Sequence, residues 1–372
     1  MERVQQKWAP LLRFEPATTQ DEGAGVSESG DRRRATVHDV AREAGVSLAT
    51  VDRVLNGRPG VRRVTAKRVE AAIAALDFRR DLSASLLARS RDLLVQFFIP
   101  DGANEFMENL GAAITRHGRS ARAERLGIET HLLKALDAAA LATRLDGLQK
   151  SACDCAVIVA TEDPAVQRAV DAATRRGITV MTLVSDLPGS SRRHFIGIDN
   201  IAAGRTAASL MGRFCPDGGK IGLIAGSLGL RDHRERLEGF RAVAAAEFPE
   251  LTLVGPFEGH DQRGETEHLA EDLLKAHRDL VGLYNLGAGN AGLLSALTAS
   301  GRAGKVHVIA HELTGATRAA LEQGVIDVVL DQNPDGEIRA AIAAARTLAT
   351  DPAARFDGQR IEIGIFLRDN LL

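Results

Sequence analysis

The stretch TVHDVAREAGVSLATVDRVLNG, residues 36–57, decides the fold of the amino-terminal part of the chain. Thr36 followed three residues later by Asp39 is a helix start signal, and apolar residues at helical spacing then predict a helix of two turns. Gly45 ends this helix because glycine readily adopts the left-handed conformation of a tight turn, and Ser47 can cap the next helix through its side-chain oxygen. The pattern predicts two short helices joined by a tight turn.

The residues that follow complete a three-helix unit. Residues 56–60, NGRPG, have turn chemistry, and a third amphipathic helix is expected after them. Three short helices around one small core form the helix-turn-helix arrangement, whose second helix enters the major groove of DNA. The second helix, Leu48 to Leu55, is expected to bury Val51, Val54 and Leu55 and to expose Leu48, Ala49, Asp52 and Arg53; the third is expected to bury Val64, Val69, Ala72, Ile73 and Leu76.

Charge separates this part of the chain from the rest. Residues 31–91 contain fourteen Lys and Arg against seven Asp and Glu, a net charge of +7, whereas the whole chain carries −2 and the remainder therefore −9. A basic module on an acidic carrier is typical of nucleic-acid-binding proteins. The charge pattern therefore favours DNA as a partner.

After residue 92 the sequence alternates short apolar runs with helical patterns about a dozen residues long. This alternation predicts parallel sheets covered on both faces by helices, with ligands bound at the carboxyl ends of the strands. About 270 residues are enough for two such lobes. The expected fold class is therefore an all-α helix-turn-helix headpiece followed by a two-lobed α/β effector domain. The predicted parallel strands are Leu93–Ile99, Leu126–Leu132, Ala156–Ala160, Thr179–Leu183, Lys220–Ala225, Thr252–Pro256, Val281–Tyr284, Val306–Ala310 and Asp327–Leu330.

Other features of composition limit the class of protein. Residues 1–34 show no helical or strand period and are predicted to be a flexible tail. Cys153, Cys155 and Cys215 are odd in number, and the C-x-C spacing of the first two suits neither a redox pair nor a zinc half-site. No run approaches the roughly 18 apolar residues of a membrane span, and no apolar signal core follows the first residue. We therefore expect a cytoplasmic protein without a structural metal and without a membrane partner.

The quoted stretch resembles the headpiece of the lactose-repressor (LacI/GalR) family of transcription regulators. The resemblance continues into SASLL at residues 83–87, which is similar to the family's hinge helix, and the rest resembles a ribose-binding-protein-like effector domain. Arg80 and Ser85 depart from the family pattern, which usually has a proline and an Arg or Gln there. The resemblance implies a tail at 1–34, a headpiece at 35–80, a hinge at 81–92 and an effector and dimerisation domain at 93–372.

The resemblance also implies a set of DNA contacts. A homodimer on a pseudo-palindromic operator is expected, and pairing of dimers into tetramers is left open. Arg53 can donate two hydrogen bonds to a guanine edge, whereas Leu48 and Ala49 can contact only apolar features such as a thymine methyl. Leu87 falls where the family inserts a leucine into the minor groove, although a leucine that merely packs in a helix is the alternative. Phosphate contacts are expected from Thr50, Asn56, Arg62 and Arg63, and the helix-start residues Thr36 and Ser47 complete the DNA-binding set.

For the small-molecule effector, the resemblance implies a cleft between the lobes. Phe106 would stack on a sugar ring, with Asn104 hydrogen-bonding and Met107 beside them; a helix cap and a core aromatic are the alternative interpretation. Arg234 aligns with a ligand-binding arginine of the family, and an arginine fork recognises vicinal hydroxyls or a carboxylate. The effector class is a sugar, polyol or sugar acid. Further cleft candidates at strand ends or lobe crossings are Asp186, Asp199, Asn285, Glu312 and Gln332.

Two alternatives belong to other functional classes. Gly287, Gly289 and Gly292 form a G-x-G-x-x-G pattern after a predicted strand, with an acidic residue twenty positions beyond Gly292, which fits an NAD-dependent enzyme. A periplasmic solute receptor shares the two-lobed fold, but the headpiece and the missing signal peptide argue against it. No hydrolase, zinc-protease or P-loop motif is present, so neither catalytic residues nor a cofactor nor a metal are expected.

Overall fold

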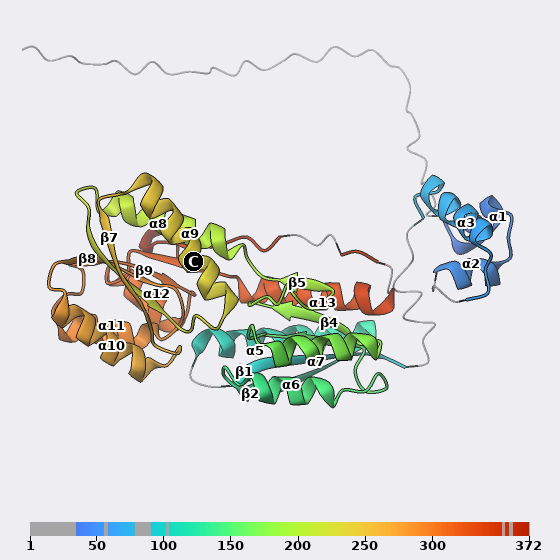
Figure 1. The fold of residues 1–372 in the computed structure, drawn as a ribbon, viewed down its shortest axis with the longest axis horizontal. Coiled ribbons are helices and arrows are strands. Elements are labelled where there is room, and N and C mark those ends of the chain that lie inside the picture. The colour runs from blue at the N-terminus through green and yellow to red at the C-terminus, as the bar shows by residue number, and fades with distance from the viewer. Residues whose placement is uncertain are drawn as a thin grey trace, which may run out of the picture.

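The computed structural model describes residues 35–55, 59–78, 91–101, 104–351, 354–356 and 360–371. Its amino-terminal unit contains α1 (Val37–Ala44), α2 (Leu48–Leu55) and α3 (Arg63–Ala75), as predicted from the sequence (Figure 1). Their apolar faces meet in one small core that includes Val40, Val51 and Val69, each with no exposed surface.

Local hydrogen bonds explain why the first two helices begin and end where they do. The Thr36 backbone N–H donates to Asp39 Oδ2 at 2.8 Å and the Asp39 N–H donates to Thr36 Oγ1 at 3.3 Å, which is a reciprocal capping box. Gly45 ends α1 in the left-handed conformation with φ 60°. The Thr50 N–H donates to Ser47 Oγ at 3.3 Å, so Ser47 caps α2 as predicted.

Val64 is the one residue of the predicted apolar face of α3 that the structure contradicts, because 75% of its surface is exposed. At 3.6 residues per turn, Val64 lies about 140° around the helix from Val69. The buried stripe of α3 consists of Val69 and Ala72, with Ile73 partly buried beside them. Apolar character at the first turn was therefore a poor guide to burial.

The first lobe, here called the N lobe, is a parallel sheet with strand order β2-β1-β3-β4-β5. Helices α5 and α13 cover one face of this sheet, and α6 and α7 cover the other. Both faces of the sheet are therefore buried under helices, as the continuous apolar strands predicted. The elements are β1 (Leu93–Asp101), α5 (Glu105–Ala121), β2 (Leu126–Lys134), α6 (Ala138–Asp146), β3 (Cys155–Ile158), α7 (Pro164–Arg175), β4 (Thr179–Leu183), β5 (His194–Ile196) and α13 (Pro334–Thr350), with a 3-10 turn at Arg122–Glu124.

The second lobe, here called the C lobe, is a sheet with strand order β11-β10-β9-β8-β6-β7. Helices α8 and α9 pack on one face, and α10, α11 and α12 pack on the other. The elements are α8 (Asn200–Phe214), β6 (Gly219–Ala225), α9 (Arg231–Glu247), β7 (Leu251–Glu258), α10 (Arg263–Ala276), β8 (Leu280–Asn285), α11 (Asn290–Ala299), β9 (His307–His311), α12 (Gly315–Glu322), β10 (Val328–Asp331) and β11 (Gly364–Phe366), with a 3-10 turn at Arg368–Asn370.

The nine predicted strands are all present with shifts of a few residues at their ends, but β5 and β11 were not predicted from the sequence. Each has only three residues and lies at a sheet edge, where a strand needs no continuous apolar run. β11 also pairs antiparallel with β10, so the expectation of purely parallel sheets is wrong at that edge.

The chain passes between the lobes repeatedly. It leaves the N lobe after β5, returns after β10 to lay α13 on the N-lobe sheet, and ends with β11 in the C lobe. Figure 1 shows α13, far along the sequence, beside α5 and β4 of the N lobe. Because parallel strands of both lobes point their carboxyl ends at the junction, the loops after these strands face one another across it.

Candidate functional site

The exposed face of α2 is the first candidate site. Leu48, Ala49, Asp52 and Arg53 are exposed, and Thr50 is half-buried with its hydroxyl 2.9 Å from Ser47 Oγ. Arg68 on α3 donates to the Gly45 carbonyl at 3.3 Å, which ties the turn between α1 and α2 to the third helix. The face that the periodicity predicted to point outward, and that the family resemblance assigns to DNA bases, is therefore solvent-facing.

The remaining DNA-binding candidates divide into three groups. Arg62 and Arg63 are exposed at the start of α3, where phosphates can reach them. The side chain of Thr36 is engaged in the capping box of α1, since its hydroxyl donates to Asp39 Oδ2 at 2.6 Å. Asn56 and Leu87 lie outside the described residues.

A small cavity lies between the lobes, and it is the second candidate site. We call it the polar chamber and define it by Asp232, Arg236, Glu312 and Gln332, which contribute charged and amide groups to its C-lobe side. The N lobe contributes Asn104, Phe106, Met107, Val159, Val184 and Ser185, and further C-lobe contributions come from Leu230, His233, Asp261, Gly287 and Ala288.

Four side-chain atoms of the polar chamber are buried without a hydrogen-bond partner among the described residues. They are Asp232 Oδ1, Arg236 Nη2, Glu312 Oε2 and Gln332 Oε1. An unsatisfied buried polar group costs about 1–3 kcal/mol, and more when it is charged. Three oxygens and one guanidinium N–H around a small cavity can instead pair with the hydroxyls of a polar ligand.

Arg236 is held in place by the protein before any ligand arrives. Its Nε donates to Asn200 Oδ1 at 2.9 Å and its Nη1 donates to the Leu286 carbonyl at 2.7 Å, while only 1% of the residue is exposed. The remaining Nη2 is therefore a preorganised donor at the polar chamber.

Glu312 has an unusual backbone and an unusual protonation. Its φ is 71°, in the left-handed region that favours glycine, and Gln332 Nε2 donates to its Oε1 at 2.7 Å. Burial raises the pKa of the Glu312 carboxyl to about 8, although the charge of Arg236 opposes this rise. At neutral pH the carboxyl is mostly protonated, so it can donate as well as accept a hydrogen bond.

Contacts between the lobes close one side of the cleft. Glu162 of the N lobe forms ion pairs with Arg231, at 3.6 Å, and with Arg234 of the C lobe. The Arg231 N–H donates to Ser185 Oγ at 3.2 Å, so the N lobe caps α9, whose own N-cap residue Leu230 provides no side-chain cap. The N-terminal end of α9 is therefore in direct contact with the N lobe.

Five of the nine effector candidates line the polar chamber: Asn104, Phe106, Met107, Glu312 and Gln332. Asn104 also caps α5, accepting hydrogen bonds from the N–H groups of Phe106 and Met107. Phe106 is 5% exposed and belongs to the N-lobe core. It is therefore both a core aromatic and a residue that lines the polar chamber.

The other four candidates do not line the polar chamber. Arg234 is bound by Glu162 and by the Leu228 carbonyl, and Asp186 is paired with Arg192 and Thr182. Asp199 is an exposed N-cap that accepts from the Ala202 N–H. Asn285 is buried and holds the loop after β8 through Ala288 and Asn290. Local hydrogen bonds and ion pairs thus engage these four side chains outside the polar chamber, and a role for them in effector binding stays a prediction.

Sequence reasoning missed Asp232 and Arg236, which the structure places in the chamber. The signal was available in the helical period of α9, where Asp232, Arg236 and Phe240 recur at four-residue spacing on the buried side. Arg234 lies two residues from Arg236 and therefore on a different face.

The glycine loop after β8 has an intramolecular explanation. A Cβ at Gly287 would lie 2.7 Å from the Gly226 nitrogen, and one at Gly292 would lie 2.0 Å from the Arg263 carbonyl oxygen. Gly289 has φ 79° and abuts Thr266. Packing against neighbouring loops and α10 therefore accounts for each glycine without a dinucleotide.

Two family models match the chain. One described as periplasmic binding protein domain matches residues 95–352, and one described as bacterial regulatory proteins, lacI family, matches residues 36–81. The chain belongs to the periplasmic binding protein domain family and carries a lacI-family domain. The family resemblance and the fold class expected from the sequence are thereby confirmed.

Curated relatives match this lacI-family chain over the headpiece region. Catabolite control protein A of Priestia megaterium is 44% identical over 79 residues, which is 21% of this chain and 24% of the relative. The HTH-type transcriptional regulator pepR1 of Lactobacillus delbrueckii subsp. lactis is 39% identical over 84 residues, 23% of this chain and 25% of the relative. The chain thus spans about a quarter of the length of these relatives in the matched region.

Solved structures match the two lobes. An ABC transporter solute binding protein from Burkholderia graminis in complex with D-arabinose has a TM-score of 0.70 at 22% identity, covering 76% of this lacI-family chain and 97% of that protein. GanP, a glucose-galactose binding protein from Geobacillus stearothermophilus, has a TM-score of 0.68 at 18% identity, covering 76% and 99%. These likenesses show the two-lobed fold.

Two further observations concern the described part of this lacI-family chain. None of its described helices combines the length and the apolar character needed to cross a membrane. Within the same residues, no three histidine, cysteine, aspartate or glutamate side chains gather so that they could hold a metal ion.

Proposed function

We propose that the chain is a cytoplasmic DNA-binding transcription regulator that acts as a repressor. A small sugar-like molecule bound between the lobes controls its affinity for the operator. The observation that carries this proposal is the combination, in one chain, of an exposed helix-turn-helix face with an interlobe cavity that contains four unpartnered buried polar atoms. A non-enzymatic role is part of the proposal, supported by relatives that are named as regulators.

On the DNA side, we assign base reading to Arg53, Leu48 and Ala49 of α2, and phosphate positioning to Thr50, Arg62 and Arg63. Their exposure supports this assignment, because a recognition helix must present its outer face to the groove. A homodimer on a pseudo-palindromic operator, with half-sites about one helical turn apart, follows from the family geometry.

On the ligand side, we assign recognition to Asp232, Arg236, Glu312 and Gln332 of the polar chamber, with Asn104, Phe106 and Met107 facing them from the N lobe. Sugar hydroxyls both donate and accept, which matches a chamber that offers one guanidinium donor and three unpartnered oxygens, one of them on the protonated carboxyl of Glu312. Related folds named as binding arabinose, glucose and galactose support a sugar or polyol as the ligand class.

Coupling between the two sites requires an element with two arrangements. The interlobe contacts of Glu162 and Ser185 with the start of α9 supply such an element, since they exist only when the lobes approach. A ligand that changes lobe closure would shift operator affinity by a coupling free energy of about 1–3 kcal/mol, and the operator must shift ligand affinity equally.

Two titrations test the proposal. Fluorescence anisotropy with DNA from the neighbourhood of the chain's own gene should reveal a site bound at least about 1,000-fold more tightly than scrambled DNA at moderate salt. A thermal-shift screen of sugars, polyols and sugar acids should then identify a ligand that raises the melting temperature and changes operator affinity. Absence of sequence preference, with and without every ligand screened, would overturn the proposal.

A further inference from the structure

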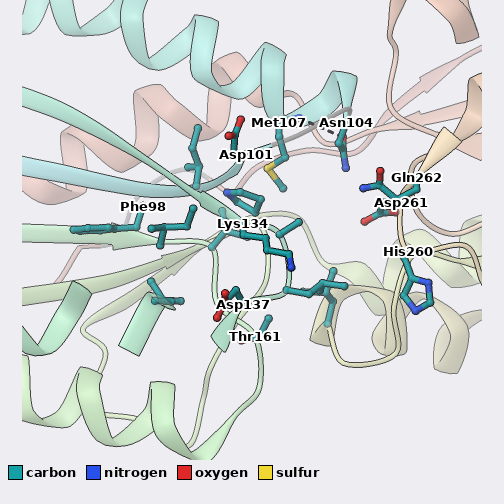
Figure 2. Close-up of a pocket in the computed structure, with 18 residues that line it drawn as sticks. Phe98, Asp101, Asn104, Met107, Lys134, Asp137, Thr161, His260, Asp261 and Gln262 are labelled. Carbon is teal, nitrogen blue, oxygen red and sulfur yellow. Dashed lines mark hydrogen bonds between the residues drawn. The ribbon is translucent and has the colours of Figure 1, made fainter. Parts of the chain in front are cut away.

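A second, larger cavity adjoins the polar chamber and shares with it Asn104, Met107, Val159, Leu230 and Asp261. It lies between the carboxyl ends of β1 and β2 in the N lobe and the loop at 260–262 in the C lobe. Figure 2 shows Met107, Asn104 and Lys134 facing His260, Asp261 and Gln262 across this space. The two cavities are therefore neighbours that share part of their lining.

The walls of the larger cavity are mainly aliphatic. Its lining includes Ile99, Leu133, Leu136, Leu141 and Val159, and we call it the apolar chamber on this account. Phe98 also lines it, but this ring stacks on His131 with centroids 4.9 Å apart, so one of its faces is already occupied. Such walls stabilise an apolar group in proportion to the surface it removes from water.

Several polar groups of the apolar chamber already have partners within the protein, although Thr161 Oγ1 on its wall is buried without a hydrogen-bond partner among the described residues. Asp137 Oδ1 accepts from the Ala140 N–H at 2.8 Å, Asp261 Oδ1 accepts from the Ala288 N–H at 2.7 Å, and Asn104 caps α5. Lys134 is exposed, so its ammonium group can remain in water. A second sugar ring would need many hydrogen-bond partners here, and an apolar group would need none.

We propose that the natural ligand is a glycoside: a polyhydroxylated ring in the polar chamber, carrying an aryl or alkyl aglycone that fills the apolar chamber. This inference rests on the proposed function, because it takes the polar chamber as the site of a sugar-like ligand. Each chamber matches one half of such a molecule in polarity, and Met107 at their shared wall provides a flexible apolar contact for the bond between the halves.

The test uses matched pairs of the methyl and 4-nitrophenyl glycosides of D-arabinose, D-galactose and D-fucose, with affinities for the full chain measured by calorimetry. For at least one sugar, the 4-nitrophenyl glycoside should bind about tenfold or more tightly than its methyl partner. The methyl glycoside reports on the polar chamber alone, and the ratio within a pair reports on the apolar chamber.

Three variants locate the preference. Ala135→Phe should fill the apolar chamber, and Leu136→Asp should place a carboxylate on its wall; both should abolish the preference for the aryl member while methyl glycosides bind as before. Leu136 has φ 60°, a conformation that aspartate tolerates better than leucine, so this second variant should fold even if the first does not. Ala139→Phe, with the same added bulk at an exposed position of α6 that lines neither chamber, is the matched control and should keep the preference.

Three results would overturn the inference. If methyl glycosides bind as well as their aryl partners, the apolar chamber has no ligand, and the proposed function stands. If a disaccharide binds more tightly than both members of every pair, the occupant is a second sugar instead. If no glycoside binds while operator DNA does, both this inference and the sugar assignment of the proposed function fail, and the DNA-binding assignment remains.

Discussion

The exposed face of α2 and the polar chamber between the lobes are both polar, but they are polar in opposite ways. On α2, Arg53 and its neighbours are exposed, so water satisfies their polar groups. In the chamber, Arg236 and Glu312 are almost completely buried, and one polar atom of each has no hydrogen-bond partner among the described residues. A surface site therefore affects binding without much effect on folding, whereas a buried site affects both.

Replacing Arg236 should have the largest effect of any single change. Arg236→Met removes the charge that faces Glu312 and leaves the Leu286 carbonyl and Asn200 unpaired, which should lower the free energy of unfolding by about 3 kcal/mol or more and abolish ligand binding. Urea denaturation and calorimetry with an identified ligand measure these two quantities.

Arg234→Ala is the matched control for Arg236→Met, because Arg234 belongs to the same helix but pairs with Glu162 outside the chamber. Its unfolding free energy should change by less than about 1 kcal/mol, as expected for a partly exposed ion pair. Equal losses in both variants would remove the distinction between the two arginines.

Replacing Arg53 should change recognition and leave stability alone. Arg53→Ala should reduce the preference for the operator over scrambled DNA by about 1–3 kcal/mol, while salt-sensitive binding to scrambled DNA stays nearly the same. Anisotropy titrations on both DNAs check this expectation. Arg63→Ala should instead weaken both by a similar factor and reduce the salt slope by about one; if both variants behave alike, base reading by Arg53 is excluded.

Replacing Glu312 should change the pH dependence of stability. Because burial raises the pKa of Glu312 from 4.5 to about 8, its stabilising contribution is complete below about pH 4.5 and is lost as pH rises towards 8. In Glu312→Gln, this loss should be absent. Between pH 5 and 7, the slope of unfolding free energy against pH should therefore be less negative in the variant than in the unmodified protein, by up to about 1.4 kcal/mol per pH unit. Urea denaturation across this range measures the slope, and parallel curves for the two proteins would show that Glu312 ionises normally.

Replacing Gly45 should have the smallest effect. Gly45→Ala meets no neighbouring atom within 4 Å, but the left-handed backbone at φ 60° disfavours alanine by about 1 kcal/mol. Thermal unfolding of the headpiece transition in the full chain measures this cost. A loss well above this value would mean that the substitution also breaks the hydrogen bond from Arg68 to the Gly45 carbonyl.

Most of the headpiece could be predicted because its determinants are local. The capping box of Thr36 and Asp39, the left-handed Gly45 and the cap at Ser47 act within a few residues, so their spacing in sequence is their spacing in space. Val64 was misassigned because apolar character alone does not say which side of a first turn faces the core.

The cleft could be predicted only in part for the opposite reason. Glu312 and Gln332 follow strands whose carboxyl ends face the junction, which the sequence pattern indicates. Whether Arg234 or Arg236 reaches the chamber depends on how α9 is rotated against α8 and the loop after β8. Whether a candidate side chain is available to a ligand depends on partners elsewhere in the chain, such as Glu162 for Arg234 and Arg192 for Asp186.

By itself, the sequence determined the helix-turn-helix unit, the alternation of strands and helices, and the outward face of α2, because periodicity and capping are short-range properties of a chain. Only the tertiary structure decided which arginine reaches the chamber, that Glu312 is protonated, and that an aliphatic space adjoins the polar one. These properties depend on burial and on contacts between distant segments, and burial of a polar atom is a property of everything packed around it.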